Sequence, residues 1–156
     1  MYGEDMYGED SPSPYRIITT LRRTERTLAS ALEEALRAVD LTAAQFHVLE
    51  ELTVTEVLHV GELAWRLRVT RQSMHGIVRN LARAHLVELA PKEHGSRNVW
   101  LTQGGRDRLL QARDRVAPIE RQVGAAVADG DRGPLVRLLS SIGRSMEATS
   151  REWWWD

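Results

Sequence analysis

The chain has 156 residues, no cysteine and a formal net charge of −1 at pH 7. This length is typical of one domain, and the lack of cysteine excludes disulfides, thiolate metal sites and thiol-based redox sensing. No apolar run reaches the roughly 18 residues that suggest a membrane span, and the acidic N-terminus lacks the apolar core of a signal peptide. We therefore expect a cytoplasmic protein with no membrane partner.

The charges are distributed unevenly along the chain. Residues 1–10 are the pentapeptide MYGED in tandem, with four acids and no base, and Ser-Pro-Ser-Pro follows. We expect residues 1–14 to form a disordered acidic tail. Residues 66–97, in contrast, hold seven bases, two acids and three histidines. A basic central region favours a local anionic partner, most commonly the phosphate backbone of a nucleic acid.

The first part of the chain predicts two helices. Apolar residues recur at spacings of three and four over residues 15–40, which indicates a long helix. A short second helix follows, and either Asp40 or Thr42 can act as its N-cap. Residues 53–60 are rich in β-branched types and predict a loop with a short strand.

The central part predicts two short helices and a β-hairpin. The first helix begins at Gly61. Thr70 is a good N-cap for the next helix, whose apolar residues Met74, Ile77, Val78 and Leu81 share one face. The strands LVELAP and NVWLT flank the polar segment KEHGS. Two helices joined by a tight turn and followed by a hairpin predict a winged helix-turn-helix over residues 41–101, with its third helix shaped for a major groove.

The last part predicts two more helices over residues 102–156. Thr102 can cap a long helix, and ADGDRGP (128–134) is expected to break it before a final helix begins. The chain ends in EWWWD, whose tryptophans we expect to pack on a partner subunit or on the first helix. The fold class is therefore mainly α with a small β wing.

Three segments resemble the multiple-antibiotic-resistance regulator (MarR) family of transcription factors: LTAAQFHVLEEL (41–52), HVGELAWRLRVTRQSMHGIVRNLARAHLVE (59–88) and VWLTQGGR (99–106). The resemblance implies a homodimer formed by the long N- and C-terminal helices, with two recognition helices in successive major grooves of a palindromic site. It also implies a repressor released by a small, often aromatic, effector, without a cofactor. The alternative is a winged-helix protein–protein module that does not bind DNA.

The polar face of the predicted recognition helix is the main candidate site. Such a face on an arbitrary helix is usually only solvated, but in this context it favours DNA contact. Arginine pairs bidentately with guanine and glutamine with adenine, and hydroxyls near a helix N-terminus can bind phosphate. The recognition-helix candidates are Thr70, Arg71, Gln72, Ser73, His75, Gly76, Arg79 and Asn80; the backbone candidates are Arg66 and Arg68; the wing candidates are Lys92, His94, Ser96 and Arg97.

The chain departs from the family's pattern in three places. Family members often carry a basic residue at the position of Gly76, where glycine instead permits close backbone approach to DNA. The glycine that usually ends the recognition helix is replaced by His85, which tolerates a left-handed conformation. The wing has Glu93-His94-Gly95-Ser96-Arg97 in place of an acid followed by arginine, so a shorter, less basic wing tip is expected, with Arg97 as its main DNA contact.

Other chemistry finds little support. The five histidines form no metal motif, no catalytic motif is present, and the adjacent acids Glu33-Glu34 and Glu50-Glu51 are interpreted as solvated. Periodicity places Trp65 and Trp100 away from the core, where such residues usually pack on a neighbouring helix. They can instead line an effector pocket, with the candidate residues Tyr15, Phe46, His47, Trp65 and Trp100.

Overall fold

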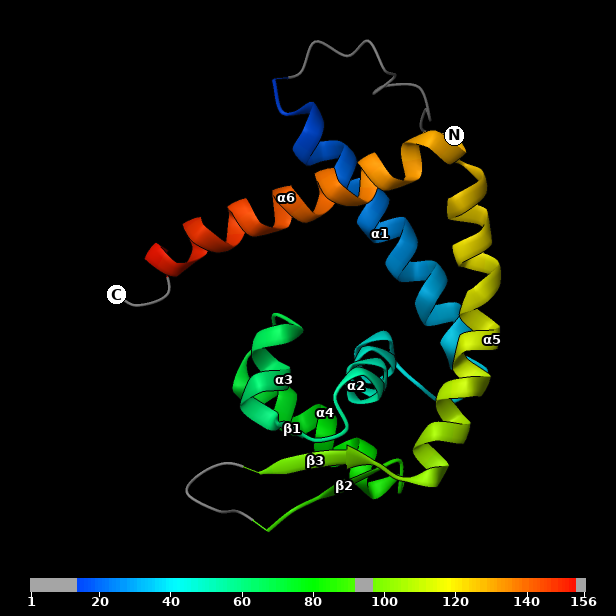
Figure 1. Ribbon diagram of the computed structural model, residues 1–156, viewed down its shortest axis with the longest axis vertical. Coiled ribbons are helices and arrows are strands. Elements are labelled where there is room, and N and C mark those ends of the chain that lie inside the picture. Colours follow the sequence, from blue (N-terminus) through cyan, green and yellow to red (C-terminus); the bar gives the residue numbers. More distant parts are fainter. Residues whose placement is uncertain (1–13, 92–96, 154–156) are drawn as a thin grey trace, which may run out of the picture. The chain divides into compact units, whose positions relative to one another are not determined.

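The computed structural model describes residues 14–91 and 97–153, with side chains as far as residue 146 (Figure 1). The chain divides into two compact units, with the boundary between Val116 and Ala117. The elements of the described chain are α1 (Arg16–Arg37), α2 (Ala43–Val54), β1 (Leu58–His59), α3 (Val60–Arg66), α4 (Arg71–Arg83), β2 (Val87–Leu89), β3 (Asn98–Leu101), α5 (Gln103–Ala125) and α6 (Asp129–Trp153).

The three strands form one antiparallel sheet in the order β1-β3-β2 (Figure 1). Leu58 pairs with Val99 across β1 and β3, and Val87 pairs with Leu101 across β2 and β3. These four side chains are buried, because the sheet contacts α2 through β3 and α4 through β2. The hairpin predicted from the alternating sequence is confirmed, whereas its connecting segment, KEHGS, lies outside the described residues.

Threonines cap two helices of the helix-turn-helix lobe, residues 41–101. The Thr42 hydroxyl accepts a hydrogen bond from the backbone N–H of Gln45, whose side chain accepts one from the N–H of Thr42, so a complete capping box begins α2. Asp40, the alternative cap, has a φ of 53° and belongs to the end of α1. The Thr70 hydroxyl accepts from the N–H of Ser73 and begins α4, as predicted.

Three helices end in a left-handed residue that is not glycine. Asp40, Arg68 and His85 have φ values of 53°, 56° and 56° and follow α1, α3 and α4. After α4, the N–H of Leu86 donates to the carbonyl of Leu81 and that of His85 to the carbonyl of Ala82, which is the Schellman pattern. The left-handed conformation predicted for His85 is confirmed.

The beginning of α5 is fixed against the end of α4. The Thr102 hydroxyl accepts a hydrogen bond from the N–H of Gly105 and donates one to the carbonyl of His85. Gly105 is buried, and a Cβ atom there would overlap the carbonyl oxygen of Leu86. The backbone of α5 therefore approaches the segment that follows α4 at a point where only glycine fits.

Arginines on α3 and α5 hold the helices of the first unit together. The Arg113 guanidinium donates to both carboxylate oxygens of Glu50, at 2.7 and 2.6 Å, and the pKa of Arg113 is raised by these hydrogen bonds. Arg66 forms an ion pair with Glu51 at 3.2 Å. The interpretation of Glu50-Glu51 as solvated was wrong, because each carboxylate is partly buried against an arginine from another helix.

Glu33 has a structural partner as well. Its Oε1 accepts a hydrogen bond from the backbone N–H of Ala43, at 3.1 Å, so it joins α1 to the first turn of α2. Arg108 of α5 makes a second link to this region, since its Nη1 donates to the carbonyl of Val39 at 2.7 Å. The end of α1 is thus bound by residues of both α2 and α5.

In the second unit, the predicted break between the last two helices was wrong in its position. The segment 128–134 was expected to separate the last two helices, but α6 begins at Asp129 and includes Pro134. Two acids in its first turn stabilise the helix, because negative side chains interact favourably with the positive end of the helix dipole. Arg132 pairs with Asp129 at 3.0 Å and donates to the carbonyl of Gly124 at 2.8 Å. These contacts allow α6 to start despite its glycines, and the break shrinks to residues 126–128. None of the helices in the described chain is both long and apolar enough to span a membrane.

Candidate nucleic-acid interface

Helix α4 has one buried face and one exposed face. Met74, Val78 and Leu81 are buried in the core of the lobe. The opposite face is exposed and makes no side-chain hydrogen bond or ion pair with any other described residue; it consists of Arg71, Gln72, His75, Arg79 and Asn80. The sequence-based division of the helix is confirmed, and the charged groups of this face are available to a ligand.

The two hydroxyls at the beginning of α4 are engaged with each other. The Thr70 hydroxyl donates to the hydroxyl oxygen of Ser73 at 2.8 Å while it accepts from the N–H of Ser73 at 3.1 Å. These two bonds do not use the hydroxyl proton of Ser73, which can still be donated to a ligand. Contact of the two hydroxyls with phosphate stays a prediction.

Gly76 lies in the middle of this helix, and nothing lies within 4 Å of a Cβ atom built on it. Unlike Gly105, it is therefore not required by packing within the chain. A glycine inside a helix costs up to about 1 kcal/mol relative to alanine. Neither packing within the described chain nor helix propensity accounts for glycine at this position.

The two backbone candidates before α4 differ in their surroundings. Arg66 is half-buried, with Glu62 at 2.7 Å and Glu51 at 3.2 Å from its guanidinium nitrogens. The hydrogen bonds to Glu62 and Glu51 raise the pKa of Arg66. A phosphate would have to replace carboxylates there, so this role stays a prediction. Arg68 is exposed, and its Cζ lies 5.1 Å from the centre of the Trp65 ring.

Only part of the predicted wing is described. Lys92, His94 and Ser96 lie outside the described residues. Arg97 is exposed at the start of β3, and its carbonyl accepts a hydrogen bond from the N–H of Val60 at 3.1 Å. The base of the wing is thus tied to the first residue of α3, which fixes the backbone from which the Arg97 side chain extends.

The residues predicted to line an effector pocket come from separate elements. Phe46 is buried in the core and its ring centre lies 5.5 Å from that of the exposed His47. The Trp100 indole N–H donates to Glu88 across the sheet, at 3.0 Å. Tyr15 precedes α1 and is exposed. Trp65 projects from α3.

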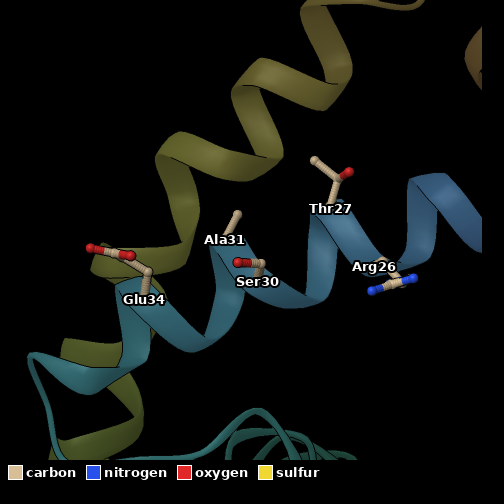
Figure 2. A pocket seen from close by; sticks show the side chains of 5 residues that line it. All are labelled: Arg26, Thr27, Ser30, Ala31 and Glu34. Carbon is tan, nitrogen blue, oxygen red and sulfur yellow. The ribbon is translucent and has the colours of Figure 1, made fainter. Parts of the chain in front are cut away.

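A shallow depression lies along α1 instead. It has a volume of about 510 Å³, and all of its lining side chains come from that helix (Figure 2): Arg26, Thr27, Ser30, Ala31 and Glu34. It includes none of the five predicted pocket residues. Within the described part of the chain, no group of three His, Asp or Glu side chains is arranged to hold a metal ion.

Two features of this lobe could not be read from the sequence. The Arg66 and Arg113 ion pairs join residues 15 and 63 positions apart, so no local pattern reveals them. The contact of Trp65 with Arg68 is made by a residue with a positive φ, which no local pattern predicted. In the sequence, this contact is indicated only by an arginine three residues after an aromatic residue that is expected to be exposed.

The capped third helix, the preceding helix and turn, and the antiparallel hairpin define a winged helix-turn-helix protein. A sequence profile of the MarR family matches residues 39–97. Among solved structures, the Mycobacterium tuberculosis transcriptional regulator MosR is 30% identical over 84% of this chain and 95% of that chain, with a TM-score of 0.72. The structure of MosR in complex with DNA is 28% identical over 85% of this chain and 96% of that chain, with a TM-score of 0.73. The chain belongs to the MarR family of winged helix-turn-helix, DNA-binding transcriptional regulators, which are not enzymes.

More distant structures share the fold. A mutant of Escherichia coli MarR in complex with operator DNA is 23% identical over 83% of this chain and 98% of that chain, with a TM-score of 0.71. Bordetella bronchiseptica BpsR, whose DNA binding is regulated by 6-hydroxynicotinic acid, is 19% identical over 82% of this chain and 98% of that chain. The TM-score is 0.75. A search of curated proteins finds no match.

Proposed function

We propose that this chain is a homodimeric repressor that binds a palindromic operator through α4 and leaves it when a small organic ligand binds. The observation that carries the proposal is the exposed face of α4, where three positively ionisable side chains follow one another at helical spacing: Arg71, His75 and Arg79. Because the opposite face is buried in the lobe, the helix has a single orientation in which to meet a groove.

Each part of this face has its own role in the proposal. Arg71 and Gln72 lie in the first turn of α4 and read base edges. His75 follows one turn later, beside the open backbone of Gly76. The remaining contacts position the lobe on the phosphate backbone, and they are assigned to Thr70, Ser73, Arg79, Asn80, Arg68 and the wing residues Lys92, His94, Ser96 and Arg97.

Dimerisation is supported by apolar side chains that the single chain leaves in solvent. On α1, Ile17 is 71% exposed, and on α6, Leu138 is 63% exposed. Large apolar residues exposed in a series along a helix are typical of surfaces covered by another protein. A two-fold dimer would present two copies of α4 to half-sites one helical turn, about 34 Å, apart.

Release by a ligand is supported by the regulation of BpsR by 6-hydroxynicotinic acid. The depression on α1 is the candidate site, and its lining combines apolar surface with the opposite charges of Arg26 and Glu34, which suits an organic molecule that carries both apolar and polar groups. Because DNA is the ligand of α4, the proposal also agrees with the cytoplasmic location expected from the sequence.

The second candidate function, a protein–protein module, needs a partner for the same arginine-rich face. A mobility-shift titration with DNA from upstream of the coding sequence separates the two. We expect affinity to fall steeply as salt rises, with log K linear in log salt, because bound phosphates release counterions. No shift at low salt would contradict the proposal and favour the protein–protein module.

A further inference from the structure

Trp65 is a large apolar residue placed on the surface of the helix-turn-helix. Its side chain is 58% exposed, whereas the apolar residues beside it in α3, Leu63 and Ala64, are buried. The flat face of its ring is covered by the guanidinium of Arg68, whose Cζ lies 5.1 Å from the ring centre. A guanidinium at that distance is attracted by the electron-rich face of the indole, and tryptophan is the best aromatic partner for it.

The backbone of Arg68 adds a second observation. With a φ of 56° it occupies the left-handed region, where arginine is uncommon and glycine is the ordinary choice. The turn itself needs only backbone groups: the N–H of Val69 donates to the carbonyl of Ala64 at 3.1 Å, and that of Arg68 to the carbonyl of Trp65 at 3.4 Å. Since glycine would make the same bonds without strain, the turn does not explain the arginine side chain.

The position of the pair in the fold indicates what the side chain is for. Arg68 precedes Thr70, the N-cap of α4, by two residues, and two residues span at most about 7 Å. The backbone of Arg68 therefore lies next to the end of α4 that begins with Arg71. A long side chain that extends from this position can reach the phosphates of a duplex bound at this end of the helix.

We propose that Trp65 is a positioning residue for DNA binding, which holds the Arg68 guanidinium in place to grip a backbone phosphate beside the first turn of α4. The inference rests on the proposed DNA-binding function. A guanidinium carries five N–H donors in one plane, and those that point away from the ring can meet two phosphate oxygens. Holding it in advance also reduces the side-chain entropy lost on binding. Trp65 thereby belongs to the DNA interface rather than to an effector pocket.

The test uses the full chain and two fluorescent duplexes of about 30 base pairs, long enough for two half-sites: one from upstream of the coding sequence and one of random sequence. Dissociation constants are measured by anisotropy between about 50 and 200 mM salt. Trp65→Leu keeps apolar bulk but removes the aromatic face, and Trp65→Phe keeps a face. We expect the leucine variant to bind about five- to thirtyfold more weakly, since both subunits of a dimer are affected, and the phenylalanine variant to recover most of the affinity.

Arg68→Ala should lower the magnitude of the salt slope by about 0.9 per phosphate, hence by about 1.8 for a dimer. In that background, Trp65→Leu should have no further effect, because the ring acts through the arginine. Val54→Ala is the matched control, since Val54 is an apolar residue of α2 that is 80% exposed. Thermal unfolding of each variant confirms that it is folded.

The outcomes separate the two proposals. Absence of binding by the wild-type chain to both duplexes would remove the DNA-binding function itself. If the wild type binds and Arg71→Ala impairs it, but Trp65→Leu binds like the wild type or weakens binding equally with and without Arg68, only the positioning role is overturned. Equal losses in Trp65→Leu and Trp65→Phe would also overturn it, because a contact through the ring face requires the phenylalanine to substitute.

Discussion

The hydroxyl of Thr102 donates a 2.7 Å hydrogen bond to the carbonyl oxygen of His85, and thereby joins the first residue before α5 to the left-handed residue that ends α4. The same hydroxyl accepts the N–H of Gly105 at 2.9 Å. One side chain thus caps the beginning of one helix and satisfies a carbonyl at the end of the other.

Replacing Thr102 should therefore destabilise the lobe. We expect Thr102→Ala to lower the free energy of unfolding by about 1–2 kcal/mol, because it removes both the cap and the bond to His85. Thr102→Ser keeps the hydroxyl and should retain most of the stability. Urea denaturation followed by circular dichroism measures both, and equal stability of the alanine variant and the wild type would contradict the assignment.

Gly105 should tolerate no side chain. A Cβ atom there would overlap the Leu86 carbonyl and lie 3.1 Å from the Leu101 side chain, so the backbone must move. We expect Gly105→Ala to destabilise the fold by about 1–3 kcal/mol, as overpacking of a close contact does. A wild-type midpoint in the same denaturation experiment would show that α5 approaches the Leu86 carbonyl less closely than described.

Gly76 should behave in the opposite way. Its Cβ position is open, so Gly76→Ala should raise the free energy of unfolding by up to about 1 kcal/mol through helix propensity alone. If the glycine serves close approach to DNA, the same variant should bind the operator more weakly even though it is more stable. An alanine variant that gains stability and keeps full affinity would remove any DNA-related reason for this glycine.

Base recognition should depend on the first turn of α4. We expect Arg71→Ala and Gln72→Ala each to weaken specific binding by about 1–3 kcal/mol, while binding to random-sequence DNA changes less. Arg115→Ala is a suitable control, because Arg115 is an exposed arginine of α5 outside the proposed interface. Mobility-shift titrations with specific and random duplexes measure the affinities of these variants. Unchanged affinity of both α4 variants would refute the assignment.

The wing arginine should act through charge. Arg97→Ala is expected to weaken binding to specific and random DNA alike and to lower the magnitude of the salt slope by about 0.9 for each phosphate that the variant no longer neutralises. Measurement of Kd at several salt concentrations tests this. A variant that changes base preference while keeping the wild-type salt slope would instead make Arg97 a base-reading residue.

Features encoded locally were predictable from the sequence. The caps at Thr42, Thr70 and Thr102, the amphipathic pattern of α4 and the alternating strands each depend on residues a few positions apart, and all are present. The left-handed His85 was predictable from the resemblance to the MarR family, which usually has a glycine at that position.

Features that depend on the meeting of distant segments were not predictable. Glu50 and Glu51 look like solvated acids until α5 and α3 bring Arg113 and Arg66 to them. The start of α6 was missed because glycine and proline usually mark a break, whereas Arg132 bridges Asp129 and the carbonyl of Gly124. Within the candidate site, the contact of Arg68 with Trp65 was not predicted, because Arg68 has a backbone conformation that arginine seldom adopts.

Helix α5 is attached to the rest of the first unit by several contacts and then continues into the second unit. Up to Val116 this helix is fastened to the rest of the first unit at three places, through Gly105 against Leu86, through Arg108 to Val39 and through Arg113 to Glu50. The helix then continues past Pro118 into the second unit. In a dimer of the proposed kind, α4 reads the bases, whereas the helices proposed to form the dimer, α1 and α6 among them, set the distance between the two halves of the palindrome.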